Sequence, residues 1–252
     1  MCPHSRSEYF YADNIILHVG ILENKCDDLA GNISKSLTLK DEDAFEAFNY
    51  YRSEAWKIRG VIEPISSLNK VGSKNTYAYK FDWDDHRRFI VADFKKLIRA
   101  SHGTEISLIT GNNKLVEGYG FLIYPAGPSK RFISKNMMLF WSNFATTGKP
   151  GFSTNGINWD SYDHFNGSKN FMILDNKKNM KVVNSDTTYK KLVEELNLDK
   201  RVSELERCVI LYQMGTFVGN DILDEISKYA DFSCKREDSR KFLEENASFI
   251  SY

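Results

Sequence analysis

The chain contains the segment Arg99-Ala-Ser-His-Gly-Thr-Glu-Ile-Ser-Leu-Ile-Thr-Gly111, which carries most of what can be inferred about its fold and function. It places His102 on a tight polar turn, immediately before an apolar run that predicts a buried strand from Glu105 to Thr110. A histidine at the lip of such a turn can be oriented by the turn and still face solvent, as a general base requires. A lone His-Gly pair is more often a surface feature, so the interpretation depends on the surrounding sequence.

The composition excludes several classes of protein. With 252 residues the chain is long enough for one large domain or two small ones, and 42% hydrophobic residues are enough for a core. Lys plus Arg and Asp plus Glu number 34 each, so no basic surface indicates a nucleic-acid partner. No apolar run reaches about 18 residues, so we expect no membrane span. The N-terminus has no apolar signal-peptide region, so the cytoplasm is the default expectation.

The cysteines give no sign of a metal centre. They are Cys2, Cys26, Cys208 and Cys234. They form no C-x-x-C pair and do not cluster with histidine, so free, partly buried thiols are the expected state. A disulfide between Cys208 and Cys234 is the alternative if the chain reaches an oxidising compartment. Glycosylation sequons occur at Asn32, Asn166 and Asn246, and they matter only in a secreted protein.

The first clear element is a helix over Leu39–Arg59, in which aromatic and other apolar residues recur at steps of three and four. Asp41 or Asp43 can cap its N-terminus, and Gly60 is expected to end it. The proline and small polar residues that follow predict a loop over residues 62–73.

Further along the chain, strands and helices alternate. Aromatic residues alternate over Thr76–Trp83 and predict a strand, which a charged, solvated loop follows. A short helix is expected within Ile90–Ala100. A second well-marked helix begins at Ser134 as its N-cap and ends at Gly148. Phe171–Leu174 predicts a late strand.

The ends of the chain complete this coarse picture. Residues 14–20 are typical of a strand or a buried helical turn, and residues 187–230 predict three amphipathic helices. The mixed order of elements indicates the α/β class. Two or three strands do not complete an α/β sheet, so either further strands exist or the chain is part of a larger domain.

Aromatic side chains are concentrated around these elements. They include Tyr77, Tyr79, Trp83, Trp141 and Trp159. Together they could form a flat platform for a ligand, but residues at strand and helix spacing are far more often part of a core. We therefore expect them to be buried.

Four blocks occur in a fixed order. They are Tyr77-Ala-Tyr-Lys-Phe81, Ala100-Ser-His-Gly-Thr-Glu-Ile106, Met138-Leu-Phe-Trp-Ser-Asn-Phe-Ala-Thr-Thr-Gly-Lys-Pro150 and Trp159-Asp-Ser-Tyr162. In this order the chain resembles the C-terminal part of type-B carboxylesterases, the carboxylesterase and cholinesterase branch of the α/β-hydrolase fold. The strong matches cover Thr76–Leu174. The resemblance implies one partial α/β-hydrolase domain over residues 1–252, with an incomplete central sheet and flanking helices.

The resemblance also carries catalytic roles. The family's Ala-x-His-Gly-x-Glu block provides the triad base, a role that transfers to His102: its neutral imidazole would accept the proton of an attacking serine and return it to the leaving alcohol. Glu105 matches the glutamate of this block, and its simplest role is to hydrogen-bond the backbone of the turn. The triad acid precedes the histidine in this fold, and Glu8 is its nearest equivalent, although a charged N-terminus is usually just solvated. Glu46 and Glu54, expected on the polar side of a helix, are poorer candidates.

The nucleophile is missing from the sequence. A G-x-S-x-G elbow would expose a serine beside the oxyanion-hole amides, and no such pentapeptide occurs. Gly151-Phe-Ser-Thr-Asn155 departs from the pattern and follows His102, which is the wrong order for this fold. The sequence therefore predicts a carboxylic ester hydrolase represented by its C-terminal portion, nearly inert alone and acting on a small-molecule ester only with a serine-bearing N-terminal half.

No cofactor or metal is implied by this chemistry. The sheet would end in an unpaired edge, which favours self-association. The alternative function is a non-catalytic, esterase-like binding or interaction module. A serine-bearing fragment that co-purifies with the chain would favour the enzyme, and a stable soluble monomer would favour the module.

Overall fold

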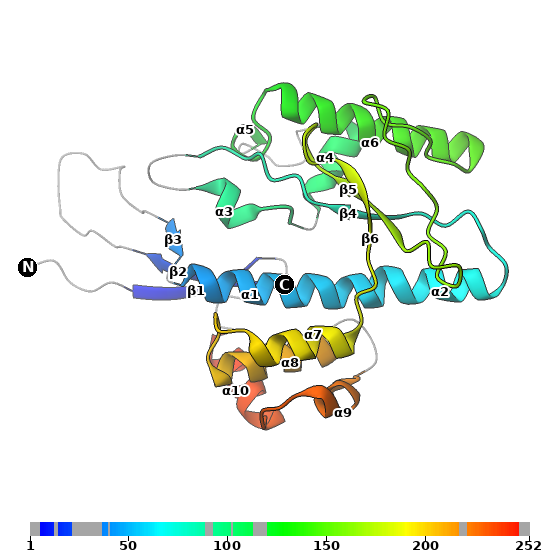
Figure 1. Cartoon of the computed structure of the whole chain (residues 1–252). Coiled ribbons are helices and arrows are strands. Elements are labelled where there is room, and N and C mark those ends of the chain that lie inside the picture. The colour runs from blue at the N-terminus through cyan, green and yellow to red at the C-terminus, as the bar shows by residue number, and fades with distance from the viewer. Residues whose placement is uncertain are drawn as a thin grey trace, which may run out of the picture. The chain divides into compact units, whose positions relative to one another are not determined.

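The computed structural model describes residues 6–12, 15–21, 37–39, 41–88, 93–101, 103–112, 120–216 and 221–246 (Figure 1). The chain divides into two compact units. Unit 1 comprises Met1–Glu63 and Thr187–Tyr252, and unit 2 comprises Pro64–Asp186. The expectation of one domain over residues 1–252 stays a prediction, because each unit is described by itself.

Unit 1 combines a small antiparallel sheet with a group of helices (Figure 1). Its strands pair in the order β1-β2-β3 and are β1 (Arg6–Ala12), β2 (Ile15–Ile21) and β3 (Leu37–Leu39). Its helical elements are α1 (Glu42–Lys57), η1 (Ile58–Ile62), α7 (Tyr189–Leu198), α8 (Glu204–Thr216), α9 (Leu223–Ile226), η3 (Ser227–Tyr229) and α10 (Arg236–Asn246). Of the two alternatives expected for residues 14–20, a strand or a buried helical turn, the structure shows the strand, β2. The helices expected over residues 187–230 are α7, α8 and α9, and β1, β3 and α10 are additional.

Helix α1 provides one side of the core of unit 1, and α7 and α8 pack against it. Its buried apolar residues are Ala44, Phe45, Ala47, Phe48, Tyr51 and Ala55. Facing helices bury Leu192, Val193, Leu196, Val209, Ile210, Leu211 and Met214. Helices α8 and α9 approach closely at Gly215, where an added Cβ atom would lie 2.7 Å from the Cα atom of Leu223. Only glycine fits this crossing without displacing the backbone.

The start of α1 is as expected, but its end is not. The Asp41 side chain accepts a hydrogen bond of 2.9 Å from the Ala44 N–H, which makes Asp41 the N-cap. Gly60 does not end the helix: the chain continues through the π-helical turn η1 into α2 (Glu63–Lys70), so the loop expected over residues 62–73 is wrong. The π turn comes just before Pro64, whose missing N–H is tolerated where the helical hydrogen-bond pattern changes.

Unit 2 contains a mixed sheet and several helices (Figure 1). Its strands are β4 (Ala78–Phe81), β5 (Asn170–Leu174) and β6 (Lys181–Asn184). Its helices after α2 are α3 (Phe94–Ile98), α4 (Thr104–Thr110), α5 (Gly120–Ile123) and α6 (Pro128–Thr147). Strand β5 pairs in parallel with β4 and antiparallel with β6. A parallel pair connected through helices is typical of the α/β class, and β4 and β5 confirm the two strands expected here.

Two boundaries in unit 2 differ from expectation. Residues 105–110 form part of helix α4 and not a strand. A short apolar run fits either element, and in this run only Leu108 and its neighbour Ser107 are buried. Helix α6 begins at Pro128, in the position where a missing N–H costs least, and not at Ser134. The Ser134 hydroxyl instead donates a 2.7 Å hydrogen bond to the Leu108 carbonyl and ties α6 to α4. The end of α6 at Gly148 is confirmed.

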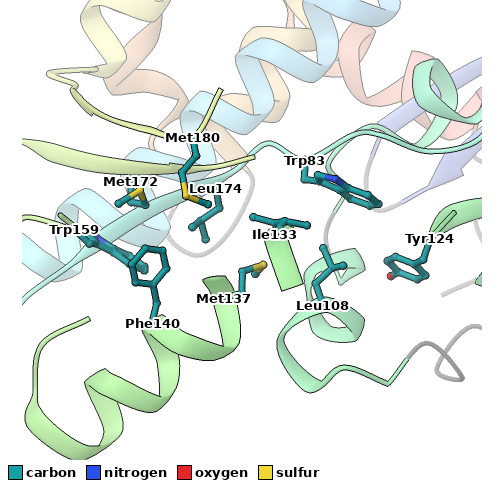
Figure 2. Packing of buried hydrophobic residues seen from close by; sticks show 10 residues of the cluster. All are labelled: Trp83, Leu108, Tyr124, Ile133, Met137, Phe140, Trp159, Met172, Leu174 and Met180. Carbon is teal, nitrogen blue, oxygen red and sulfur yellow. The ribbon is translucent and has the colours of Figure 1, made fainter. Parts of the chain in front are cut away.

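The core of unit 2 lies between its sheet and helices α4 and α6 (Figure 2). It consists of Trp83, Leu108, Tyr124, Ile133, Met137, Phe140, Trp159, Met172, Leu174 and Met180. Partly buried Tyr77, Tyr79 and Trp141 pack against it. The aromatic residues therefore belong to the core, as expected, and do not form an exposed ligand platform.

The cysteines of unit 1 differ from the favoured expectation. Cys208 in α8 and Cys234 form a disulfide, with their Cα atoms 5.4 Å apart, so the expectation of free thiols is wrong for this pair. Spacing alone leaves this choice open, because the decision depends on how α8 packs against the following segment. Cys2 and Cys26 lie outside the described residues. Of the helices that the structure describes, none has the length and apolar character required to cross a membrane.

Candidate functional site

The candidate site is the turn between α3 and α4, where the chain runs from Arg99 to Thr104. His102 itself lies outside the described residues, but the backbone on both sides of it is described. Arg99 has a φ of 50°, and among the described residues it is the only non-glycine with a positive φ. Gly103 has a φ of 86° and precedes the first turn of α4. A strained non-glycine residue costs of order 1–3 kcal/mol and persists only where neighbouring contacts hold it.

A buried histidine supplies one of these contacts. His86 is 5% exposed, and its Nδ1 and Nε2 atoms lie 2.6 Å from the carbonyl oxygens of Ile123 and Arg99, respectively. Both partners are acceptors, so a ring nitrogen that carries a hydrogen donates it to the carbonyl oxygen that it faces. His86 thereby fixes the strained Arg99 carbonyl to the end of α5.

The other side of the turn is held by hydroxyl groups. The Tyr124 hydroxyl donates a 2.8 Å hydrogen bond to the Thr104 carbonyl. The Thr104 hydroxyl donates a 2.7 Å hydrogen bond back to the Ser101 carbonyl and closes the turn across position 102. Burial raises the pKa of Tyr124, and the nearby Glu105 charge adds to this effect. Tyr124 therefore remains a hydrogen-bond donor across the neutral pH range.

An indole ring connects these two supports. Trp83 is fully buried, and its ring lies edge-on to the His86 ring with 5.1 Å between the ring centroids. The Trp83 and Tyr124 rings are stacked with 6.2 Å between their centroids (Figure 2). The Trp83 Nε1–H donates a 2.9 Å hydrogen bond to the Ser129 hydroxyl, which in turn donates to the Asp85 carboxylate. The support of the turn is therefore continuous with the core of unit 2.

The charged loop after β4 is more ordered than its composition indicates. The Lys95 ammonium group lies 2.6 Å from the Asp84 carboxylate and 3.5 Å from that of Asp85. Burial raises the pKa of Asp175, whose carboxylate accepts hydrogen bonds from the Asn176 N–H and from the Asn179 side chain. In the part of the chain that the structure describes, no group of three His, Cys, Asp or Glu side chains could hold a metal ion.

The remaining candidate residues stand as follows. Glu105 lies half-buried in the first turn of α4, and its supporting role stays a prediction, since the turn's described hydrogen bonds come from other side chains. Glu8 lies in β1 opposite Val19, but its side chain is outside the described part, so its role also stays a prediction. Glu54 was expected on a polar face, yet it is buried in α1, where it pairs with Lys57 and accepts a hydrogen bond of 3.0 Å from Thr187.

Sequence reasoning missed His86 and Tyr124. His86 stands in a run of aspartates and arginines, whose composition predicts a solvated loop. The signal that could have found it is the position of the run, which follows a strand and leads back to the turn. His86 can be uncharged, unlike the aspartates and arginines around it, and can therefore be buried in the core. Tyr124 lies in a glycine- and proline-rich stretch and gave no periodic signal.

Comparisons with known proteins show the family of the chain. The sequence model of the Carboxylesterase family matches residues 26–192. The chain therefore belongs to the carboxylesterase family. It is similar to Carboxylesterase 1D of Mus musculus, with 30% identity over 104 residues, which represent 41% of this chain and 16% of that protein. No solved structure matches the chain significantly.

Proposed function

We propose that this chain supplies the C-terminal part of a serine carboxylic ester hydrolase with the α/β-hydrolase fold, in which His102 is the triad base. The observation that carries the proposal is the support of the turn. His86 holds the Arg99 carbonyl, Tyr124 holds the Thr104 carbonyl, and Thr104 closes onto Ser101. A general base has to be held within a fraction of an ångström of its productive position, and supports on both sides of position 102 favour that.

The reaction would be acyl transfer in two steps. The His102 imidazole accepts the proton of a serine hydroxyl while the serine oxygen attacks the ester carbonyl, and the proton is then given to the departing alcohol. The resulting acyl-serine is hydrolysed by a water molecule, which the same imidazole deprotonates. The chain's described residues contribute by keeping the turn rigid, with Glu105 as an additional support.

The serine would come from a segment outside these 252 residues, since they contain no G-x-S-x-G sequence. Loss of the triad serine typically removes about a million-fold in rate, roughly 8 kcal/mol, so the chain alone should be nearly inert toward small-molecule esters. Among the described residues β4 has a partner strand on one side only. Its other edge would pair with the serine-bearing portion, and without that portion it favours self-association.

The test uses the complete enzyme, in which these residues are joined or bound to the serine-bearing portion. Substitution His102→Ala should lower kcat on a p-nitrophenyl ester by about a million-fold, because the nucleophile then has no base. His164→Gln, which changes a histidine elsewhere in unit 2, is the matched control and should leave kcat unchanged. Unchanged turnover of the His102 variant would contradict the proposal.

The triad acid is tested separately. If Glu8 orients the imidazole, Glu8→Gln should lower kcat by about ten-thousand-fold, because the ring then adopts the wrong tautomer. A loss below about tenfold would remove Glu8 from the triad and leave His102 as base. Glu237→Gln, at an exposed position of α10, is the control for a general change in charge.

A further inference from the structure

The turn that precedes β5 carries a motif that the proposed esterase function does not use. Asn166-Gly167-Ser168 is an acceptor sequence for N-linked glycosylation, and all three residues are exposed. The preceding residue, Phe165, is 57% exposed, which is unusual for a phenylalanine in a tight turn. We propose that Asn166 is an N-glycosylation site and that its first sugar packs on the ring of Phe165.

The local backbone presents the acceptor at the tip of a closed turn. Asp163 and Ser168 form a bridge at its base, with the Asp163 N–H donating to the Ser168 carbonyl at 2.9 Å. The Asp163 carboxylate accepts hydrogen bonds from the N–H groups of Phe165 and Asn166 at 3.0 and 3.1 Å. Gly167 has a φ of 77°, which a residue with a side chain rarely adopts. The turn is therefore ordered while its tip faces solvent.

The acceptor amide keeps its structural role after modification. The Asn166 Nδ2 atom donates a 2.5 Å hydrogen bond to Asp163 and carries two hydrogens, of which this bond needs one. Transfer forms a bond between Nδ2 and the anomeric carbon of an oligosaccharide and breaks the bond from that carbon to the diphosphate of its lipid-linked donor. The lipid diphosphate leaves with the electron pair, and the amide loses one proton. The remaining N–H can still donate to Asp163.

The exposed ring gives the sugar a surface to cover. Phe165 lies directly before the acceptor, and its ring meets the His164 ring edge-on at 5.2 Å, so one aromatic surface remains open to solvent. The first sugar of an N-linked glycan has an apolar face, and packing it on an aromatic ring removes both surfaces from water. This accounts for an exposed phenylalanine on a turn that otherwise consists of polar residues and glycine.

A second, independent feature places the chain where such a transfer occurs. The Cys208–Cys234 disulfide of unit 1 forms and persists in oxidising compartments, which are also those that N-glycosylation requires. Sequon and disulfide lie in different units of the chain. Together they favour passage through a secretory compartment over the cytoplasmic default.

The chain contains its own negative control. Asn155-Gly156-Ile157 is also an Asn-Gly turn, with Asn155 exposed and a Gly156 φ of 85°, but it has no hydroxyl two residues after the asparagine. Both sites can deamidate spontaneously, because glycine follows the asparagine in each. Enzymatic removal of a glycan in heavy-oxygen water labels the asparagine that is converted in that step, and a parallel incubation without the enzyme measures the label that spontaneous deamidation incorporates.

The experiment is peptide mapping of the complete protein purified from its own cells. The peptide with Asn166 should carry hexose and N-acetylhexosamine before the enzyme treatment, and after it should carry more heavy-oxygen label than in the enzyme-free incubation. The peptide with Asn155 should carry no sugar, and its label should be the same with and without the enzyme. Ser168→Ala should remove the glycan and Ser168→Thr should retain it, while the circular dichroism spectrum stays unchanged. An unmodified Asn166, or Cys208 and Cys234 recovered as free thiols, would overturn the proposal.

The contact with Phe165 has its own readout. In the glycosylated protein, Phe165→Ser should lower the melting temperature, because the sugar loses its aromatic partner. In the Ser168→Ala background, which carries no glycan, the same substitution should leave the melting temperature nearly unchanged. Equal shifts in both backgrounds would show that the ring does not contact the sugar and would overturn that part of the proposal.

Discussion

At the scale of single residues, the turn around position 102 depends on side chains that belong to the core. His86 and Tyr124 each use a ring buried against Trp83 to fix a backbone carbonyl on one side of His102. Their hydrogen-bonding atoms are satisfied by backbone groups and are therefore unavailable to a substrate. Their role is to position the turn, so substitutions at these residues should lower the stability of the fold and should change the catalytic step only through the turn.

Substitution His86→Ala should lower the free energy of unfolding by about 2–4 kcal/mol, because it removes the ring's hydrogen bonding to the buried carbonyl groups and opens a cavity. Urea denaturation followed by circular dichroism measures this change. The control His164→Gln should change the free energy of unfolding by less than about 1 kcal/mol. Equal effects of both substitutions would show that the two His86 hydrogen bonds do not hold the turn.

A second residue-scale prediction concerns Asp199 in unit 1. The side chain of Arg201, with help from its backbone N–H and the Tyr51 hydroxyl, lowers the pKa of Asp199 to about 2. The folded pKa lies below the unfolded value, so this carboxylate contributes stability at neutral pH and loses its contribution as the pH falls from about 4 to about 2. Asp199→Asn should cost about 2 kcal/mol at pH 7 and should flatten this acid limb. Denaturation at several pH values measures the loss at pH 7 and the fall in stability at acid pH. If the substitution leaves the fall at acid pH unchanged, Asp199 is not the group responsible for it.

At the scale of elements, close contacts between helices restrict which residue types fit at the contact positions. Helices α8 and α9 meet at Gly215, and α4 and α6 are joined by the Ser134 hydroxyl. The helix that runs from α1 through η1 to α2 shows the opposite case, since the atoms nearest to a Cβ added at Gly60 belong to the side chain of Trp56 and not to a backbone. Glycine is thus required at one helical position and not at another.

Substitution Gly215→Ala should lower the free energy of unfolding by about 1–3 kcal/mol, because its Cβ atom would overlap the backbone of Leu223. Gly60→Ala is the matched control: its Cβ atom would meet only the flexible, 44% exposed Trp56 side chain, which can move. Thermal denaturation compares the two variants. The idea fails if Gly60→Ala is the more destabilising.

The sequence predicted elements whose signals are local. The Asp41 cap, the Gly148 stop and strand β5 follow from residues adjacent to each other in the chain. It did not predict helix α4 or the continuation of α1 beyond Gly60, because short apolar runs fit either element and a glycine ends a helix only when its backbone takes a left-handed conformation. The residues that support the candidate turn could not be predicted either, because their positions depend on contacts that are distant in the sequence. His86, for example, contacts Arg99 and Ile123.

At the scale of the whole molecule, the Cys208–Cys234 disulfide covalently links two segments of unit 1. It closes a loop with a sequence separation of 26 residues and connects α8 to the segment before α10. Replacing both cysteines, as in Cys208→Ser with Cys234→Ser, should lower the free energy of unfolding by about 3 kcal/mol, since the unfolded chain regains the freedom of that loop. Cys2→Ser is the control. In the parent protein, adding a reductant should lower the free energy of unfolding by the same amount as the double substitution. If the reductant has no effect, the disulfide does not stabilise unit 1.

The division of the chain into units has a consequence for how it is made. Unit 2 is continuous, whereas unit 1 combines Met1–Glu63 with Thr187–Tyr252. During synthesis unit 2 can pair β4 with β5 before α7 and α8 have left the ribosome, so the face of α1 that packs against these two helices is still exposed at that stage. Of the helices that the structure describes, α1 is made first and is among the last to be packed, so a chaperone has longer to bind it than the others.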